Sequence, residues 1–245
     1  MSEANQPHWA SMLGVPSTGL TQGFRYHFST QRLVNGTFVR NFGSNKGLEL
    51  IVGENAQIQV GVPAYVERER PGSISSGWSD ESMLAKFRIA SANEEEGNYV
   101  ANFSLGLSLP TGSPGFSTKN TVFTPTLAAG KGWGTHESGF DIQSLVSLGV
   151  ADRNNAVTGL PFIWNTGVQA HVSRHIWPEI EVAYTHWNRG WYSGRSQMVV
   201  TYGIAYERRI AQGKSITIGA GYQEPRGTAF STFTRGWISM AKFSF

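Results

Sequence analysis

The residues of this sequence that could do chemistry fall into two groups. His171 and Ser173 lie two positions apart, so in a β-strand their side chains would share a face, where a histidine can act as the base for a serine nucleophile. The second group consists of charged residues within stretches that alternate between polar and apolar residues. Side chains of both signs that face one interior would form ion pairs and narrow a passage. These residues are Glu49, Lys86, Arg88, Asp141, Glu179, Glu181, Glu207 and Lys242.

The type of strand that would hold these residues is clearest at the end of the chain, in residues 235–245. This stretch forms two alternating sets, of which one contains Trp237, Phe243 and Phe245 and the other contains Lys242. A period of two predicts a β-strand whose side chains face two different surroundings. A soluble protein seldom ends on aromatic residues, because chain termini usually fray into water. We therefore expect this strand to stand in a bilayer, with its aromatic set facing lipid and Lys242 facing an interior.

Similar alternation recurs along the chain and predicts an all-β fold. Residues 98–109 show it best, with Phe103 and Leu105 on one face and Asn102 and Ser104 on the other. Turn-forming residues separate the alternating stretches. The predicted strands are residues 23–28, 47–53, 57–62, 81–89, 98–109, 120–131, 140–150, 162–172, 179–187, 197–208, 215–222 and 235–245.

The connections between these strands alternate in length. Long ones, including residues 31–45 and 67–79, occur near residues 37, 72, 114, 155, 191 and 228. Short ones occur near residues 54, 94, 133, 175 and 212. This layout predicts a single antiparallel up-and-down transmembrane β-barrel of about 12 strands, with short periplasmic turns and longer extracellular loops. The barrel would cover residues 21–245 and follow a loose N-terminal leader at residues 1–20.

Composition narrows the class of protein. Only 15% of the 245 residues are charged, which is a smaller share than in most soluble domains. The mean hydropathy of −0.25, however, excludes a helical membrane protein. No stretch approaches the roughly 18 apolar residues of a transmembrane helix. The absence of cysteine excludes thiolate catalysis, and a net charge of +3 is too small to suggest nucleic acid as a partner. The first residues lack the basic and apolar regions of a signal peptide, so we expect a mature form from which that peptide has been removed.

A soluble β-protein would also show strands with one polar and one apolar face. The positions of the aromatic residues favour the membrane alternative, because they would form belts at both rims of the barrel. The belt at the long-loop rim would contain Trp164, Tyr184, Tyr222 and Trp237. The belt at the short-turn rim would contain Phe140, Tyr206, Phe243 and Phe245.

Three short motifs resemble a known family. The stretch from Gly47 to Pro63 is similar to an early hairpin of the outer-membrane family called "putative MetA-pathway of phenol degradation". Gly77-Trp78-Ser79-Asp80, followed by Ala85-Lys86-Phe87-Arg88, resembles that family's Gly-x-x-Asp and Lys-Tyr-Arg pattern. Leu109-Pro110-Thr111-Gly112 also resembles the family, although Ser113 stands where an acidic residue is usual. The resemblance implies a bacterial outer-membrane barrel that takes up hydrophobic or aromatic compounds.

We therefore expect a channel or facilitator for small, hydrophobic or aromatic molecules, with a narrow polar lumen. Ile238 and Met240 are apolar at positions that should face this lumen, so they either pack under a plug or line an apolar part of the passage. One alternative is a lipid hydrolase or deacylase that uses His171 and Ser173. Arg174 counts against it, because outer-membrane enzymes of that type tend to carry Asn there. The other alternative is a structural or adhesive barrel without transport.

The expected partners follow from this prediction. They are outer-membrane lipids including lipopolysaccharide, a small-molecule substrate, and the barrel assembly machinery, whose recognition signal the terminal Phe245 resembles. No nucleic acid, metal or cofactor is expected.

Overall fold

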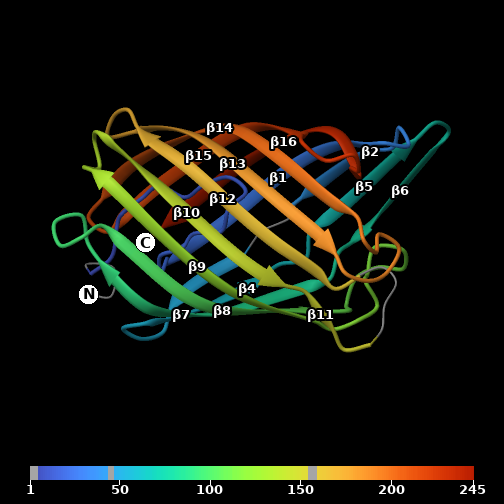
Figure 1. Cartoon of the computed structure of the whole chain (residues 1–245), viewed down its shortest axis with the longest axis horizontal. Coiled ribbons are helices and arrows are strands. Elements are labelled where there is room, and N and C mark those ends of the chain that lie inside the picture. Colours follow the sequence, from blue (N-terminus) through green and yellow to red (C-terminus); the bar gives the residue numbers. More distant parts are fainter. Residues whose placement is uncertain (1–4, 44–46, 154–158) are drawn as a thin grey trace.

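The wall of the protein is built from strands in which polar and apolar side chains alternate. In the described residues each strand pairs only with antiparallel neighbours. The computed structural model describes residues 5–43, 47–153 and 159–245. The strands in these ranges close into a 12-strand antiparallel β-barrel (Figure 1), as the sequence predicts. In the described residues the twelve wall strands comprise sixteen segments, because β2 and β3, β4 and β5, β6 and β7, and β10 and β11 each lie along one wall strand. The segments are β1 (Gly23–Leu33), β2 (Phe38–Phe42), β3 (Gly47–Ile51), β4 (Ala56–Gly61), β5 (Tyr65–Arg70), β6 (Ser73–Trp78), β7 (Glu81–Ala92), β8 (Tyr99–Leu109), β9 (Val122–Gly134), β10 (Gly139–Leu148), β11 (Val150–Ala151), β12 (Pro161–His171), β13 (Ile176–Trp187), β14 (Ser196–Ala211), β15 (Lys214–Pro225) and β16 (Phe233–Ser244).

The first and last strands close the barrel. β1 pairs with β16 from Gly23 opposite Ser244 to Leu33 opposite Phe233. The terminal strand has the two faces that its sequence predicts, because Trp237 and Phe243 are exposed on the outside, whereas Lys242 is buried inside. Ile238 and Met240 are also buried on the inner face. The closure leaves no free strand edge in this part of the wall.

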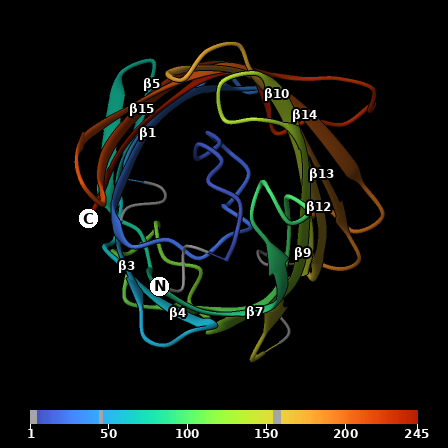
Figure 2. The ribbon, with the colours of Figure 1, turned by 90° about the vertical axis from the view of Figure 1, so that its left-hand side faces the viewer.

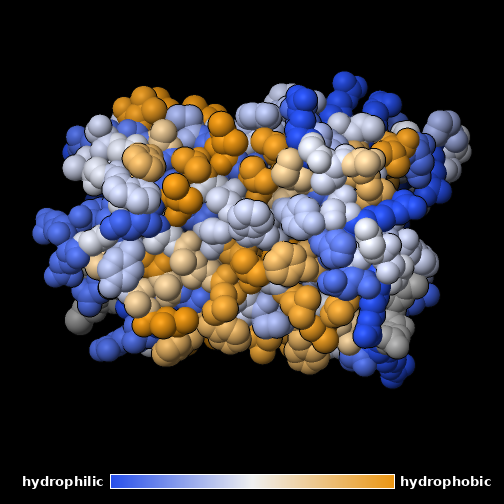
Figure 3. Space-filling view, in the orientation of Figure 1, coloured by the Kyte–Doolittle hydropathy of each residue, from blue (hydrophilic) through white to orange (hydrophobic). Residues whose placement is uncertain are grey.

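The outer surface of the barrel carries the apolar side chains. Trp237 is 59% exposed and Trp164 is 49% exposed, Phe245 and Phe243 are also exposed, and Tyr184 is half-buried. Figure 3 shows apolar residues over the middle of the wall and hydrophilic residues at both ends. Such a band suits a bilayer core between two aqueous phases. The described residues contain no helix that is long and apolar enough to cross a membrane.

Two predicted long loops are in fact strands. Within residues 31–45, β2 pairs with the end of β1 and with β5, and within residues 67–79, β5 pairs with β6 around a tight turn at Pro71 and Gly72. Gly72 has a φ of +80°, which explains why glycine is favoured at this turn. The polar composition that suggested loops belongs instead to hairpins that extend the wall, and their β5–β6 part stands at the end opposite both termini (Figure 1).

The N-terminal segment, here residues 5–22, lies inside the barrel. Figure 2 looks along the barrel from the end that holds the termini and shows this segment within the ring of strands. Leu13 and Thr18 are each 0% exposed. The expectation of a loose leader is therefore wrong for its described part, residues 5–20, because the lumen offers these residues burial and hydrogen bonds. Residues 1–4 of the predicted leader lie outside the described ranges.

Candidate functional site

The N-terminal segment enters and leaves the lumen through the same end of the barrel, where the short turns lie. The His8 amide donates a hydrogen bond of 2.7 Å to Glu94 in the turn after β7, and Trp9 Nε1 donates one of 3.0 Å to Asn98 Oδ1. The segment ends at Gln22, and β1 begins with Gly23 at this same end. Burial disfavours ionisation of Glu94, but the hydrogen bonds from His8 outweigh burial and lower the pKa of Glu94 to about 2.

Two neighbouring carboxylates of β13 hold the innermost part of the segment. Glu179 accepts a hydrogen bond of 3.0 Å from the amide of Leu13, and Glu181 accepts bonds of 2.8 and 2.9 Å from Gly14 and of 3.1 Å from Val15. Successive backbone amides that point to one side form a concavity that binds anions. A Cβ atom on Gly14 would lie 2.7 Å from Glu181 Oε2, so a larger residue here would push this carboxylate away from the backbone amides.

The returning part of the segment is held from the opposite wall. Lys86 Nζ on β7 donates hydrogen bonds to the carbonyls of Ser17 at 2.7 Å and Gly19 at 2.9 Å. Asn102 on β8 donates one of 2.5 Å to the carbonyl of Thr18. The segment is thus attached to both sides of the barrel through its backbone.

Apolar contacts complete the attachment. Leu13 packs against Ile238 and Met240 of β16 in a buried cluster. This contact confirms the first of the two explanations for these apolar lumen residues, namely that they pack under a plug. Cβ atoms added to nearby wall glycines would lie within 2.5–2.8 Å of the Leu13 side chain, so these glycines make room for it. The glycines are Gly203, Gly219 and Gly221.

Three of the charged lumen residues meet at one place. Arg25 on β1 lies directly opposite Lys242 on β16, an arrangement of like charges that is unfavourable by itself. Glu49 on β3 bridges them, with 3.1 Å between its Oε2 and Lys242 Nζ and 3.8 Å between its Oε1 and Arg25 Nε. Glu49 also accepts a hydrogen bond of 2.6 Å from Thr21 of the segment.

The other predicted lumen charges are placed apart from this cluster. Arg88 donates to the carbonyl of Glu54 at 2.7 Å, Asp141 lies 2.9 Å from His171 Nε2, and Glu207 accepts from Thr217 at 3.1 Å. The structure therefore brings together Glu49, Lys86 and Lys242 near the segment, whereas Arg88, Asp141 and Glu207 contact other groups. Sequence reasoning could not assign Glu179 and Glu181 to backbone amides, because their partners lie more than 160 residues away.

The geometry does not favour the alternative in which His171 and Ser173 form a hydrolase site. His171 Nδ1 lies 2.7 Å from the carbonyl of Thr135, and its other ring nitrogen faces Asp141. Ser173 Oγ instead accepts bonds from the amides of His175 at 3.3 Å and Ile176 at 3.1 Å. Both groups therefore have structural partners other than each other.

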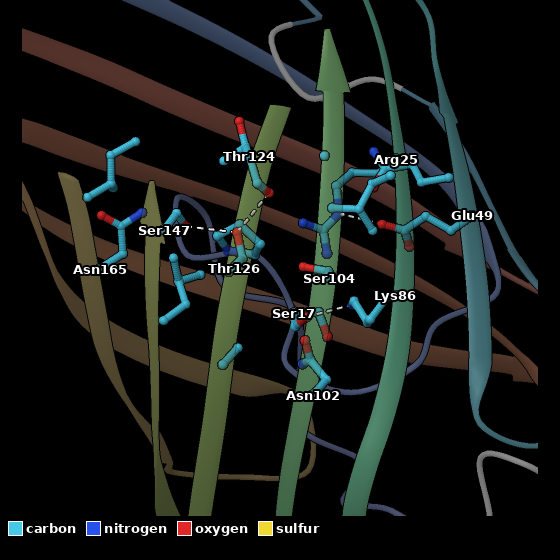
Figure 4. Close-up of a pocket in the computed structure, with 17 residues that line it drawn as sticks. Ser17, Arg25, Glu49, Lys86, Asn102, Ser104, Thr124, Thr126, Ser147 and Asn165 are labelled. Atoms are coloured by element: carbon cyan, nitrogen blue, oxygen red, sulfur yellow. Dashed lines mark hydrogen bonds and ion pairs between the residues drawn. The ribbon is translucent and has the colours of Figure 1, made fainter. Parts of the chain in front are cut away.

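The segment leaves a cavity of about 270 Å³ between its residues Pro16 and Ser17 and the wall. Figure 4 shows Arg25, Glu49 and Lys86 on one side of this cavity and Ser147 and Asn165 on the other. Thr126 Oγ1 donates a hydrogen bond of 2.9 Å to Ser147 within it. The cavity is lined mainly from β7, β8, β9, β10 and β12, together with β1, β3 and β4.

Two of the motifs that carry the family resemblance meet at the long-loop end. Asp80 accepts hydrogen bonds from the amide of Gly112 at 2.9 Å and from Thr118, whose amide lies at 2.8 Å and hydroxyl at 2.7 Å. Ser113 accepts a bond of 3.0 Å from the amide of Trp78. These motif residues therefore fix the loop between β8 and β9 against the link between β6 and β7.

The Asp80 contacts predict that the stability of the loop between β8 and β9 depends on pH. Burial opposes ionisation of Asp80, but the hydrogen bonds from Thr118 and Gly112 outweigh it and lower the pKa of this carboxyl. The Asp80 carboxylate therefore stabilises the loop fully when the pH is above the ordinary pKa of 3.8. This stabilisation is lost as the pH falls through the lower pKa that Asp80 has in the folded protein. In Asp80→Asn, amide exchange of residues 112–118 should be faster than in the unmodified protein at neutral pH.

Hydrogen exchange measured by mass spectrometry, corrected for the intrinsic pH effect, checks this prediction. Acidification should accelerate exchange in the unmodified protein and change little in Asp80→Asn. The control is Asp152→Asn, because Asp152 is exposed in another long connection. Equal exchange in all three proteins at neutral pH would show that Asp80 does not hold the loop.

Several solved structures share this architecture. An outer-membrane channel from Pseudomonas putida F1 superposes with a TM-score of 0.58 at 9% identity, covering 95% of this chain and 97% of that chain. The fold is that of an outer-membrane β-barrel. The β domain of the Bordetella autotransporter BrkA gives 0.57 at 14% identity, covering 92% of this chain and 100% of that chain. A KdgM porin in complex with disordered oligogalacturonate gives a TM-score of 0.51 at 9% identity, covering 91% of this chain and 99% of that chain.

No protein-family model matches the sequence, and no curated protein matches it. At these low identities, the likeness of this barrel to the solved structures concerns the fold alone.

Proposed function

We propose that this protein is a bacterial outer-membrane channel for small molecules, narrowed by its own N-terminal segment. The main support is the way the lumen is filled. Barrels of about eight strands fill their interiors with wall side chains, whereas those of about sixteen leave a water channel. Here the wall contributes glycines and polar residues, and a terminal segment attached at one end occupies the space. Movement of that segment would open a polar passage without any change in the wall.

We also propose that the passengers include small hydrophobic or aromatic molecules, as the resemblance to the phenol-degradation family implies. Apolar side chains in the cavity wall support this, namely those of Leu84, Leu145 and Ile163. The outer surface supports contact with outer-membrane lipids, including lipopolysaccharide at the long-loop end. The aromatic end of β16 supports recognition by the barrel assembly machinery, since Phe243 and Phe245 stay exposed.

Conductance in planar lipid bilayers tests the channel. The full chain should give small current steps in KCl, because the segment leaves only narrow spaces in the lumen. Uptake of a small aromatic compound by a deletion strain, with and without this gene, tests the passenger. A barrel that conducts neither with nor without residues 1–20 would contradict the channel and favour a structural or adhesive role.

A further inference from the structure

The cavity between the segment and the wall has one cationic side. Arg25 is 2% exposed and lines this cavity. Its Nε and Nη2 atoms are buried and have no hydrogen-bond partner, and its ion pair with Glu49 spans 3.8 Å. A guanidinium offers a planar set of donors that matches a carboxylate. A buried donor set of this kind is costly to leave unpaired, so it favours an anionic acceptor.

The charges around the cavity also favour an anion. Arg25, Lys86 and Glu49 line it, and Glu49 is already paired with Lys242 at 3.1 Å. Lys86 donates to two uncharged carbonyls of the segment. Lys242 thus neutralises the negative charge of Glu49. The positive charges of Arg25 and Lys86 are therefore in excess on this side of the cavity.

The opposite side of the cavity has a different chemistry. Leu145 and Ile163 contribute apolar surface, and Asn165 contributes a side-chain amide whose oxygen is buried and has no hydrogen-bond partner. Figure 4 shows Asn165 across the cavity from Arg25. An apolar body would cover the aliphatic side chains, and a hydroxyl group could form a hydrogen bond with the Asn165 amide. The volume is sufficient, since a cavity of about 150 Å³ holds benzene and this one is about 270 Å³.

We propose that this cavity binds a small organic carboxylate that has an apolar body and a hydroxyl group at its far end. The carboxylate lies against Arg25, the body lies along Leu145 and Ile163, and the hydroxyl forms a hydrogen bond with the Asn165 amide. The proposal rests on the proposed channel function, because the bound molecule would be one that the channel admits.

Isothermal titration calorimetry of the full chain in detergent micelles tests the proposal. The probe is 4-hydroxybenzoate, whose rigid ring holds a carboxylate and a hydroxyl at opposite ends. It should bind about tenfold or more tightly than 4-hydroxybenzyl alcohol, which lacks the charge that pairs with the guanidinium. Benzoate, which lacks the hydroxyl, should bind with intermediate affinity. Equal affinity for 4-hydroxybenzoate and the alcohol, or binding of neither, would overturn the proposal.

Variants identify the residue that recognises the anion. Arg25→Gln should remove the preference for 4-hydroxybenzoate over the alcohol, whereas Arg226→Gln should retain it, because Arg226 is exposed and pairs with Glu224 outside the cavity. A preference that persists in a folded Arg25→Gln protein would refute the role of Arg25. The probe comparison needs no variant, so it decides the matter if Arg25→Gln does not fold. Conductance without binding refutes this site alone, and binding without conductance refutes the channel alone.

Discussion

Removal of residues 1–20 should raise the single-channel conductance of the barrel several-fold. The segment occupies the lumen, and its removal would free the space taken by Met12, Leu13 and Val15, which are all fully buried. The wall should persist, because its backbone hydrogen bonds run between neighbouring strands and β1 closes directly on β16. Planar-bilayer recordings measure the conductance, and circular dichroism checks that the β-structure is retained.

A matched pair of variants separates release of the segment from general damage. Glu179→Gln with Glu181→Gln weakens the acceptors of the Leu13, Gly14 and Val15 amides and should give intermediate, fluctuating conductance. Glu137→Gln should conduct like the unmodified protein, because Glu137 is exposed at the rim and pairs with Arg174. Unchanged conductance in a folded deletion variant would mean that the segment does not restrict the passage.

Leu13→Ala should loosen the segment without unfolding the barrel. A buried Leu→Ala change costs about 2–5 kcal/mol when the site cannot collapse, and here the surrounding wall is fixed by strand pairing. Leu13 is completely buried against Ile238 and Met240. The cost falls on docking of the segment, since Leu13 contributes nothing to the strand ladders. Hydrogen exchange of residues 5–22 should therefore accelerate while exchange of β13–β16 stays slow.

The control for this prediction is the same substitution on the outer face. Leu127 on β9 is 60% exposed on the surface that we assign to lipid. Leu127→Ala removes the same atoms without opening a cavity under the segment, so exchange of residues 5–22 should not change. Similar acceleration in both variants, or none in Leu13→Ala, would show that Leu13 does not anchor the segment.

The alternation of polar and apolar residues is sufficient to predict the wall. The period of two in stretches such as Tyr99–Leu109 and Phe233–Ser244 specifies which side chains face inward, because a shift of one residue would turn every apolar side chain into the lumen. Lys242 inside and Trp237 outside follow from this pattern. The sequence does not specify where the strands end, because Asn35-Gly36 and Pro71-Gly72 mark the tips of hairpins but not the lengths of their strands.

The residues that fill the lumen can be identified only from the three-dimensional fold. Ser11 contacts Lys242 across a separation of 231 residues, and such a contact has no local signal in the chain. Ile238 and Met240 indicated that something apolar lies inside the barrel, but only closure of the wall brings Leu13 to them. The same closure places Arg25 beside Lys242 and Glu49 between them. Periodicity fixes the face on which a residue lies, whereas its partner across the lumen depends on the register and curvature of the whole barrel.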